Sequence, residues 1–170
     1  VELATGDEDL VFVASDAQVR DVRWARIAMV FQAAMNALDP VYTVGDQILE
    51  AIYRHQAAIS PEDAHERVAR LFQLVGIDPK MSARYPHEFS GGMRQRAVIA
   101  MALACSPALI IADEPTTALD VIVQDQVLRE LRRIQSALNM SMIYISHDIA
   151  VIAEVAERIG PRCRLGHRYS

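Results

Sequence analysis

The sequence predicts an α/β fold in which a parallel sheet core carries an inserted α-helical subdomain. Apolar runs of strand length occur at residues 26–32, 108–115 and 141–146, and each ends in polar residues. Longer segments with apolar residues at helical spacing separate these runs. Strands that alternate with helices along one chain are typical of α/β folds with parallel sheets.

Composition excludes several classes of protein. The chain has 170 residues, 52% of them hydrophobic and 23% charged, which is typical of a globular protein with one core. Its net charge of −5 gives no basic footprint, so we expect no nucleic-acid partner. No apolar run approaches the roughly 18 residues of a membrane span, and the acidic start "VELATGDEDL" has no signal-peptide core.

The first elements in chain order are a strand and two helices. The strand "RIAMVFQ" covers residues 26–32 and stops at a polar residue, and the helix expected at 46–55 presents its apolar residues on one side. Ser60 is the expected N-cap of a second helix, which ends at Gly76. We therefore expect residues 43–88 to form a mostly helical insertion between strands.

A third helix is expected to start in "FSGGMRQR". Ser90 suits an N-cap, and Gly91 and Gly92 leave the N–H groups of the first turn unshielded. Such a helix start attracts anions through its free donors and its dipole. The alternative is a structural cap whose glycines allow a tight approach to another backbone, and this stretch alone does not decide between the two interpretations.

The run "ALIIADEP" predicts a strand that carries Asp113 and Glu114 at its carboxyl end, where open α/β sheets bind their ligands. Neighbouring residues of a strand point to opposite sides, so one carboxylate can hold a metal ion while the other faces a water molecule. Solvated acids at a strand end are the simpler alternative.

The remaining elements are a long helix, a strand and a short helix. Asp120 suits the N-cap of the long helix, whose apolar side is formed by Val127, Leu131, Ile134 and Leu138. "SMIYIS" predicts a buried strand that ends just before His147. Asp148 suits the cap of a short helix that reaches residue 155.

Together these segments resemble the ATPase domains of ATP-binding-cassette (ABC) transporters. "FSGGMRQR" resembles their signature motif, with Phe89 and Met93 in place of its more usual Leu and Gln. "ALIIADEP" resembles their Walker B strand, "TTALD" their D-loop, "YISHD" their switch strand and "MVFQ" their Q-loop. Within the family, "MVFQAAMNALDPVYTVGDQILEAI" is most similar to the ATPase subunits of dipeptide and oligopeptide importers.

The resemblance implies the P-loop NTPase fold, with ATP and Mg²⁺ as ligands. It implies that Asp113 helps to hold Mg²⁺, that Glu114 is the general base for the attacking water, and that His147 contacts the γ-phosphate. Gln32 is implied to reach both the metal and the water.

On the same grounds, Ser90, Gly91, Gly92 and Met93 belong to the segment that binds the nucleotide of an opposite protomer, and Asp120 couples the two sites. Arg94 and Arg96 either anchor the signature helix or touch the nucleotide across the dimer. The implied partners are a second ABC ATPase protomer and transmembrane permease subunits. The implied location is the cytoplasmic face of the cell membrane.

The phosphate-binding loop G-x-x-x-x-G-K-[ST] does not occur in this sequence, whose only lysine is Lys80. We therefore expect a partial ATPase core that begins after this loop, with an unpaired sheet edge, exposed apolar surface and little activity alone. The expected domains are a partial core with the Q-loop strand at 1–42, a helical subdomain with the signature motif at 43–104, and the remaining core at 105–170.

Two other functions stay open. The chain can act without catalysis, as a docking or regulatory module that pairs with a complete ABC ATPase or with a membrane subunit. It can also belong to a non-transport ATPase of the same superfamily, acting in repair or translation. The importer-like stretch "NALDPVYTVGDQILEAI" argues against the last interpretation, because that region of the family faces the transporter.

Overall fold

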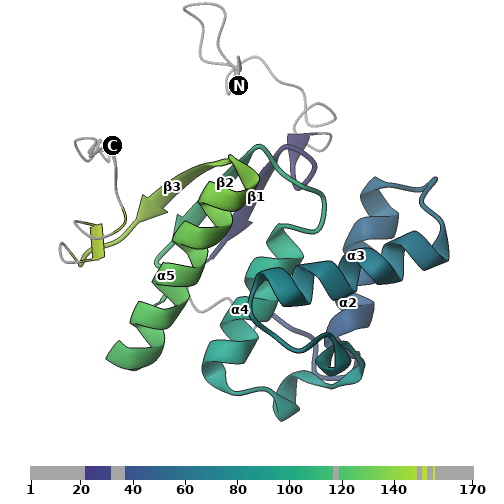
Figure 1. Ribbon diagram of the computed structural model, residues 1–170, viewed down its shortest axis with the longest axis horizontal. Helices are drawn as coiled ribbons and strands as arrows, with labels where there is room; N and C mark the ends of the chain where they lie inside the picture. Colours follow the sequence, from purple (N-terminus) through teal and green to yellow (C-terminus); the bar gives the residue numbers. More distant parts are fainter. Residues whose placement is uncertain (1–21, 32–36, 117–118, 149–150, 153–154, 156–170) are drawn as a thin grey trace, which may run out of the picture.

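The computed structural model describes residues 22–31, 37–116, 119–148, 151, 152 and 155. They form the predicted α/β arrangement, in which a parallel sheet lies beside a group of helices (Figure 1). The strands are β1 (Ile27–Val30), β2 (Leu109–Asp113) and β3 (Ser141–Ile145). The helices are α2 (Val44–His55), α3 (Pro61–Leu74), α4 (Gly91–Ala102) and α5 (Val121–Leu138), with short 3₁₀ helices η3 (Pro79–Ala83) and η4 (Pro86–Glu88) before α4.

The three strands lie in the order β1-β2-β3, and both pairs are parallel. Parallel neighbours need crossover connections, and here the helical region joins β1 to β2 while α5 joins β2 to β3. At the last register position Asp113 pairs with Ile145. This register brings the segments that follow β2 and β3 together at the carboxyl end of the sheet.

The core lies between the sheet and the helices. Ala28, Val30 and Ile110 are at most 2% exposed and share one apolar cluster with Val127, Leu131 and Ile134 of α5. The spacing of these α5 residues was predicted from the sequence, and their burial confirms it. Leu138, expected on the same side, is 46% exposed, because it lies in the last turn of α5.

Strand β3 corrects the prediction of a buried strand. Ile143 and Ile145 are 49% and 45% exposed, whereas Met142 and Tyr144 pack against the core cluster. Continuous apolar strands are typical of parallel sheets covered on both faces. Among the described residues, this face of β3 is left partly open, so burial alternates along a strand whose sequence does not alternate.

The helical region begins and ends at capping residues. Thr43 Oγ1 accepts a hydrogen bond from the Asp46 N–H, so α2 starts two residues before the predicted position. Ser60 caps α3 as predicted, and Gly76 follows its end with a left-handed φ of 68°.

Two arginines attach the end of α3 to the other helices. Arg133 of α5 donates a hydrogen bond to the Leu74 carbonyl at 2.6 Å, and Arg96 of α4 donates to the Gly76 carbonyl at 3.2 Å. Of the two roles considered for Arg96, the structure therefore provides the anchoring contact. Within the described ranges, no helix is long and apolar enough to cross a membrane.

Candidate functional site

Glu114 follows β2 in an unusual backbone conformation. Strand β2 ends at Asp113, and Glu114 has a φ of 47°, in the left-handed region that non-glycine residues rarely adopt. Its N–H still donates to the Ile145 carbonyl at 2.8 Å. Strand alternation therefore does not determine where Glu114 points; instead, this turn directs its side chain toward the segment after β3.

That segment carries His147, whose Nδ1 lies 2.6 Å from Glu114 Oε1. The hydrogen bond to this carboxylate and then its negative charge raise the pKa of His147 above the ordinary value for histidine. The His147 side chain is 71% exposed, whereas that of Glu114 is only 20% exposed. The carboxylate is thus shielded on the protein side, and the imidazole faces outward.

The pair borders a cavity of about 210 Å³ at the carboxyl end of the sheet. Its lining is formed by Glu114, Thr116, Leu119, Gln124, Ser146, His147, Asp148 and Val151. Most of these side chains are polar, and they come from the segments after β2 and β3 and from the first turn of α5. A polar hollow at this edge of a parallel sheet is where α/β proteins bind ligands.

The start of α4 has a clear structural role for one glycine. A Cβ on Gly92 would lie 2.6 Å from Cγ1 of Val123 in α5, which is closer than carbon atoms approach. A Cβ on Gly91 would lie 3.7 Å from Leu119, which is an ordinary contact. The close approach of α4 and α5 therefore requires a glycine at position 92, and the atom that approaches belongs to a side chain rather than to another backbone.

Ser90 is the N-cap of α4, and its Oγ accepts a hydrogen bond from the Met93 N–H at 3.3 Å. These residues do not line the Glu114–His147 cavity within the part of the chain that the structure describes. Leu119 links the two places, because it lines the cavity and also neighbours Gly91. Asp120 is the N-cap of α5, as predicted, and its Oδ1 accepts from the Val123 N–H at 2.9 Å.

The two carboxylates of the "ADEP" motif are separated by the end of the strand. Asp113 is the last residue of β2 and pairs with Ile145. Glu114 lines the cavity, whereas Asp113 is not among the described residues that line it. No group of three or more His, Cys, Asp or Glu residues within the described ranges could hold a metal ion. Gln32 lies outside the described residues.

Some cavity residues were missed from the sequence. Thr116 lies within "TTALD" and Ser146 within "YISHD", but neither was singled out as a site residue, and Gln124 lies in the first turn of α5. Ser146 Oγ also accepts a hydrogen bond from the Asp148 N–H. Adjacency to His147 was the available signal for Ser146, whereas the position of Gln124 follows only from the direction of α5.

Comparisons with known proteins agree with these motifs. The family model for ABC transporters matches residues 5–117. The glutathione import ATP-binding protein GsiA of Salmonella paratyphi A is 52% identical over 147 residues, which are 85% of this chain and 23% of that protein. Its counterpart in Escherichia coli O157:H7 is 51% identical with the same coverage. The chain therefore spans about a quarter of the length of these relatives.

Solved structures show the same architecture. A dimeric ATP-binding cassette in a post-hydrolysis state, bound to ADP and Pi, has a TM-score of 0.67 and 29% sequence identity; the match covers 81% of this chain and 59% of that one. A dimeric bacterial ABC transporter cassette matches with the same TM-score and identity, over 82% and 60% of the two chains. The parallel α/β fold seen here is thus part of the P-loop NTPase fold of such cassettes.

Proposed function

We propose that this chain, which belongs to the ABC transporter family, forms part of the ATP-hydrolysing subunit of an importer for small peptides. The relatives at 52% identity are named as glutathione import ATP-binding proteins, and this proposal extends their role to the present chain. The stretch that resembles peptide importers lies between β1 and the end of α2. Both observations favour a short peptide as the imported solute.

The contact between Glu114 and His147 carries the catalytic part of the proposal. A water molecule that attacks the γ-phosphate of ATP is oriented by a base that accepts its proton, and Glu114 offers a largely shielded carboxylate. His147 holds this carboxylate in place from 2.6 Å. When protonated, His147 also carries a positive charge. In the proposed site this charge would stabilise the negative charge that develops on the phosphate oxygens in the transition state.

ATP as substrate and Mg²⁺ as metal ion belong to this proposal. Carboxylate oxygens are suitable Mg²⁺ ligands, and Asp113 offers one such group at the end of β2. The described residues, however, contain no cluster that could hold a metal, and the 170 residues contain no phosphate-loop motif. These residues alone do not fit a magnesium triphosphate, so we assign no catalytic step to the metal and expect negligible ATP hydrolysis by this polypeptide alone.

We further propose that the chain acts with a second ABC ATPase protomer and with transmembrane permease subunits at the cytoplasmic face of the membrane. Dimeric cassettes among the similar structures support the first partner. The helical subdomain is proposed to comprise residues 43–104, between core segments at 1–42 and 105–170. Val41 and Tyr42, at the end of the first core segment and directly before α2, are 72% and 59% exposed and offer an apolar surface for a protein partner beside this subdomain.

The catalytic role can be tested in two ATPase assays. The 170-residue polypeptide with Mg-ATP is expected to show no turnover above its Glu114→Gln variant. A chimera that adds the preceding phosphate-loop segment of GsiA is expected to hydrolyse ATP, and Glu114→Gln is expected to slow it about 100-fold or more. Glu62→Gln, on the exposed first turn of α3, is the matched control. Full activity of the Glu114→Gln chimera would overturn the assignment.

A second candidate function is pairing without catalysis. Val121 and Ile122 are 82% and 72% exposed in the first turn of α5, directly after Asp120. Large apolar side chains at such a position favour a protein partner. A complete ABC ATPase is the proposed partner, with Ser90 on the surface that faces its nucleotide.

A pull-down with a complete ABC ATPase tests this pairing. ATP-dependent capture is expected to weaken with Ser90→Arg and to persist with Ser136→Arg, an exposed serine near the far end of α5. Absence of capture with and without ATP would remove this function. Capture that both variants weaken equally would show that Ser90 has no special place in the contact.

A further inference from the structure

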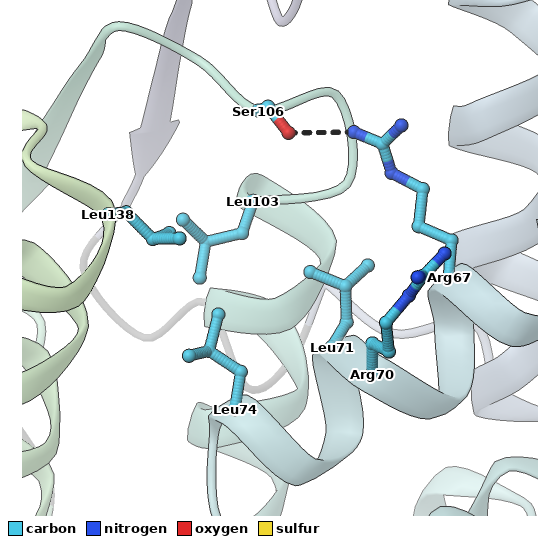
Figure 2. A pocket seen from close by; sticks show the side chains of 7 residues that line it. All are labelled: Arg67, Arg70, Leu71, Leu74, Leu103, Ser106 and Leu138. Carbon is cyan, nitrogen blue, oxygen red and sulfur yellow. Dashed lines mark hydrogen bonds between the residues drawn. The ribbon is translucent and has the colours of Figure 1, made fainter.

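A second cavity, of about 370 Å³, lies between α3, the turn after α4 and the end of α5 (Figure 2). Its volume falls within the range of about 300–1,000 Å³ that is usual for small-molecule sites. None of its lining residues also lines the Glu114–His147 cavity. Nothing in the ATPase motifs accounts for it.

One part of this cavity is aliphatic. Leu71 and Leu74 of α3, Leu103 after α4 and Leu138 of α5 line it, and Figure 2 shows their side chains pointing toward one another. Leu71 and Leu103 are buried, whereas Leu138 is 46% exposed. The leucines therefore form a wall that an apolar ligand can cover further, which favours binding of an aliphatic chain.

The rest of the rim is positively charged. The Arg67 guanidinium donates hydrogen bonds to Gln56 Oε1 at 2.9 Å and to Ser106 Oγ at 2.8 Å (Figure 2 shows the second). Both acceptors are neutral, and within the described ranges no carboxylate forms an ion pair with Arg67. Arg67 is thus held in a defined position, and no carboxylate of the described residues forms an ion pair with its guanidinium group.

The turn that presents Ser106 supports a preformed site. Ser106 has a φ of 53°, and its N–H donates to the Leu103 carbonyl at 2.9 Å. A serine in this left-handed conformation is unusual and costs free energy. The turn places its hydroxyl against Arg67, next to a leucine of the wall.

Arg70 adds a second cation, one helical turn further along α3. Its contact with Glu66 is 3.4 Å long, and both side chains are more than 60% exposed. Such an exposed ion pair is weak, so Arg70 can turn to a ligand at small cost.

We propose that this pocket binds a medium-chain aliphatic carboxylate. Its carboxylate would pair with Arg67, through the donor geometry that suits guanidinium groups, and its chain would lie along the leucines. A peptide of similar size fits less well, because its amide groups would lose water beside leucines that offer no hydrogen bonds. A bound chain would contact both α3 and the end of α5.

The test is isothermal titration of the 170-residue protein with octanoate, with octanol and acetyl-dileucine as comparison ligands. Saturable octanoate binding is expected, with octanol and the peptide each weaker by about tenfold or more, since they lack the charge or add buried amides. Arg67→Gln is expected to weaken octanoate binding about tenfold or more. Arg129→Gln, on an exposed part of α5 outside the cavity, is expected to leave it unchanged.

Leu138→Asp provides a second variant, because this residue is exposed and its replacement leaves the core intact. It is expected to abolish octanoate binding, since it places a negative charge in the wall, while the circular dichroism spectrum stays that of the parent protein. The proposal is overturned if octanoate shows no saturable binding, if Arg67→Gln binds it as tightly as Arg129→Gln does, or if octanol or the peptide binds more tightly.

Discussion

On the face of the sheet turned toward α5, Ile110 is completely buried, whereas on the opposite face Ile143 and Ile145 leave almost half of their surface exposed. The two faces belong to the same pair of neighbouring strands. In their register, Ile110 on the covered face pairs with Met142, and Ile111 on the open face pairs with Ile143. Both faces carry large aliphatic side chains. Their sequences are alike, and only their surroundings differ.

This difference shows which part of the apolar sequence stabilises the described fold. The covered face joins β1, β2 and α5 in one cluster, so it accounts for most of the hydrophobic burial of the sheet. The open face exposes apolar surface at Ile143 and Ile145, contrary to the burial predicted for β3, and such surface is suited to contact with further polypeptide.

The largest change in stability is expected from a substitution on the covered face. Ile110→Ala removes a buried side chain in the middle of β2, and we expect it to lower the free energy of unfolding by about 2–5 kcal/mol. Ile111→Ala, one residue further on the same strand but half-buried, is expected to cost less than half as much. Denaturant unfolding followed by circular dichroism measures both. Equal losses would mean that the two faces contribute alike.

The next effect concerns the helices that cover this face. Gly92→Ala places a Cβ within 2.6 Å of Val123, so α4 and α5 must move apart, and we expect a cost of about 1–3 kcal/mol. Gly91→Ala meets only an ordinary contact and is expected to stay within about 0.5 kcal/mol of the parent. Combining Gly92→Ala with Val123→Ala should recover part of the loss, and a strictly additive result would contradict the proposed clash.

A smaller effect on stability is expected from the open face. Replacing Ile143 and Ile145 together by threonine keeps β-branched residues in β3 and should change the free energy of unfolding by less than about 1 kcal/mol. Self-association, measured by sedimentation velocity, should fall. Tyr53→Gln removes exposed apolar surface on α2, outside the sheet, and serves as control. If Tyr53→Gln reduces association as strongly, the sheet face is not the surface involved.

Much of the architecture follows from local sequence signals. Ser60, Ser90 and Asp120 were predicted as N-caps, and each accepts a backbone hydrogen bond in the first turn of its helix. These signals act within a few residues, so they need no knowledge of the fold. The prediction that β3 is buried was wrong. An apolar run does not indicate how many faces of a sheet are covered, because this depends on segments far away in the chain.

The cavity at the carboxyl end of the sheet contains some of the residues expected from the sequence, but its geometry was not predictable. Glu114 and His147 were both expected, yet their direct contact depends on the left-handed backbone at Glu114, which no sequence pattern indicates. Gly92 shows a different difficulty, since a glycine required by packing and a glycine required by a ligand look the same in sequence. The Arg67 pocket was missed because its leucines come from three separate helical segments.

The last prediction concerns His147, where the segments from β2 and β3 meet. Because Glu114 raises its pKa, the stabilising contact is complete below the ordinary histidine pKa of about 6.5 and is lost as pH rises through the raised value. Glu114→Gln is therefore expected to lower the pKa of His147, as measured by NMR titration of its imidazole. Asp148→Asn should lower it less, since the charge of Asp148 is the smallest of the contributions. Equal shifts in the two variants would mean that general negative charge, rather than the 2.6 Å contact, sets the protonation of His147.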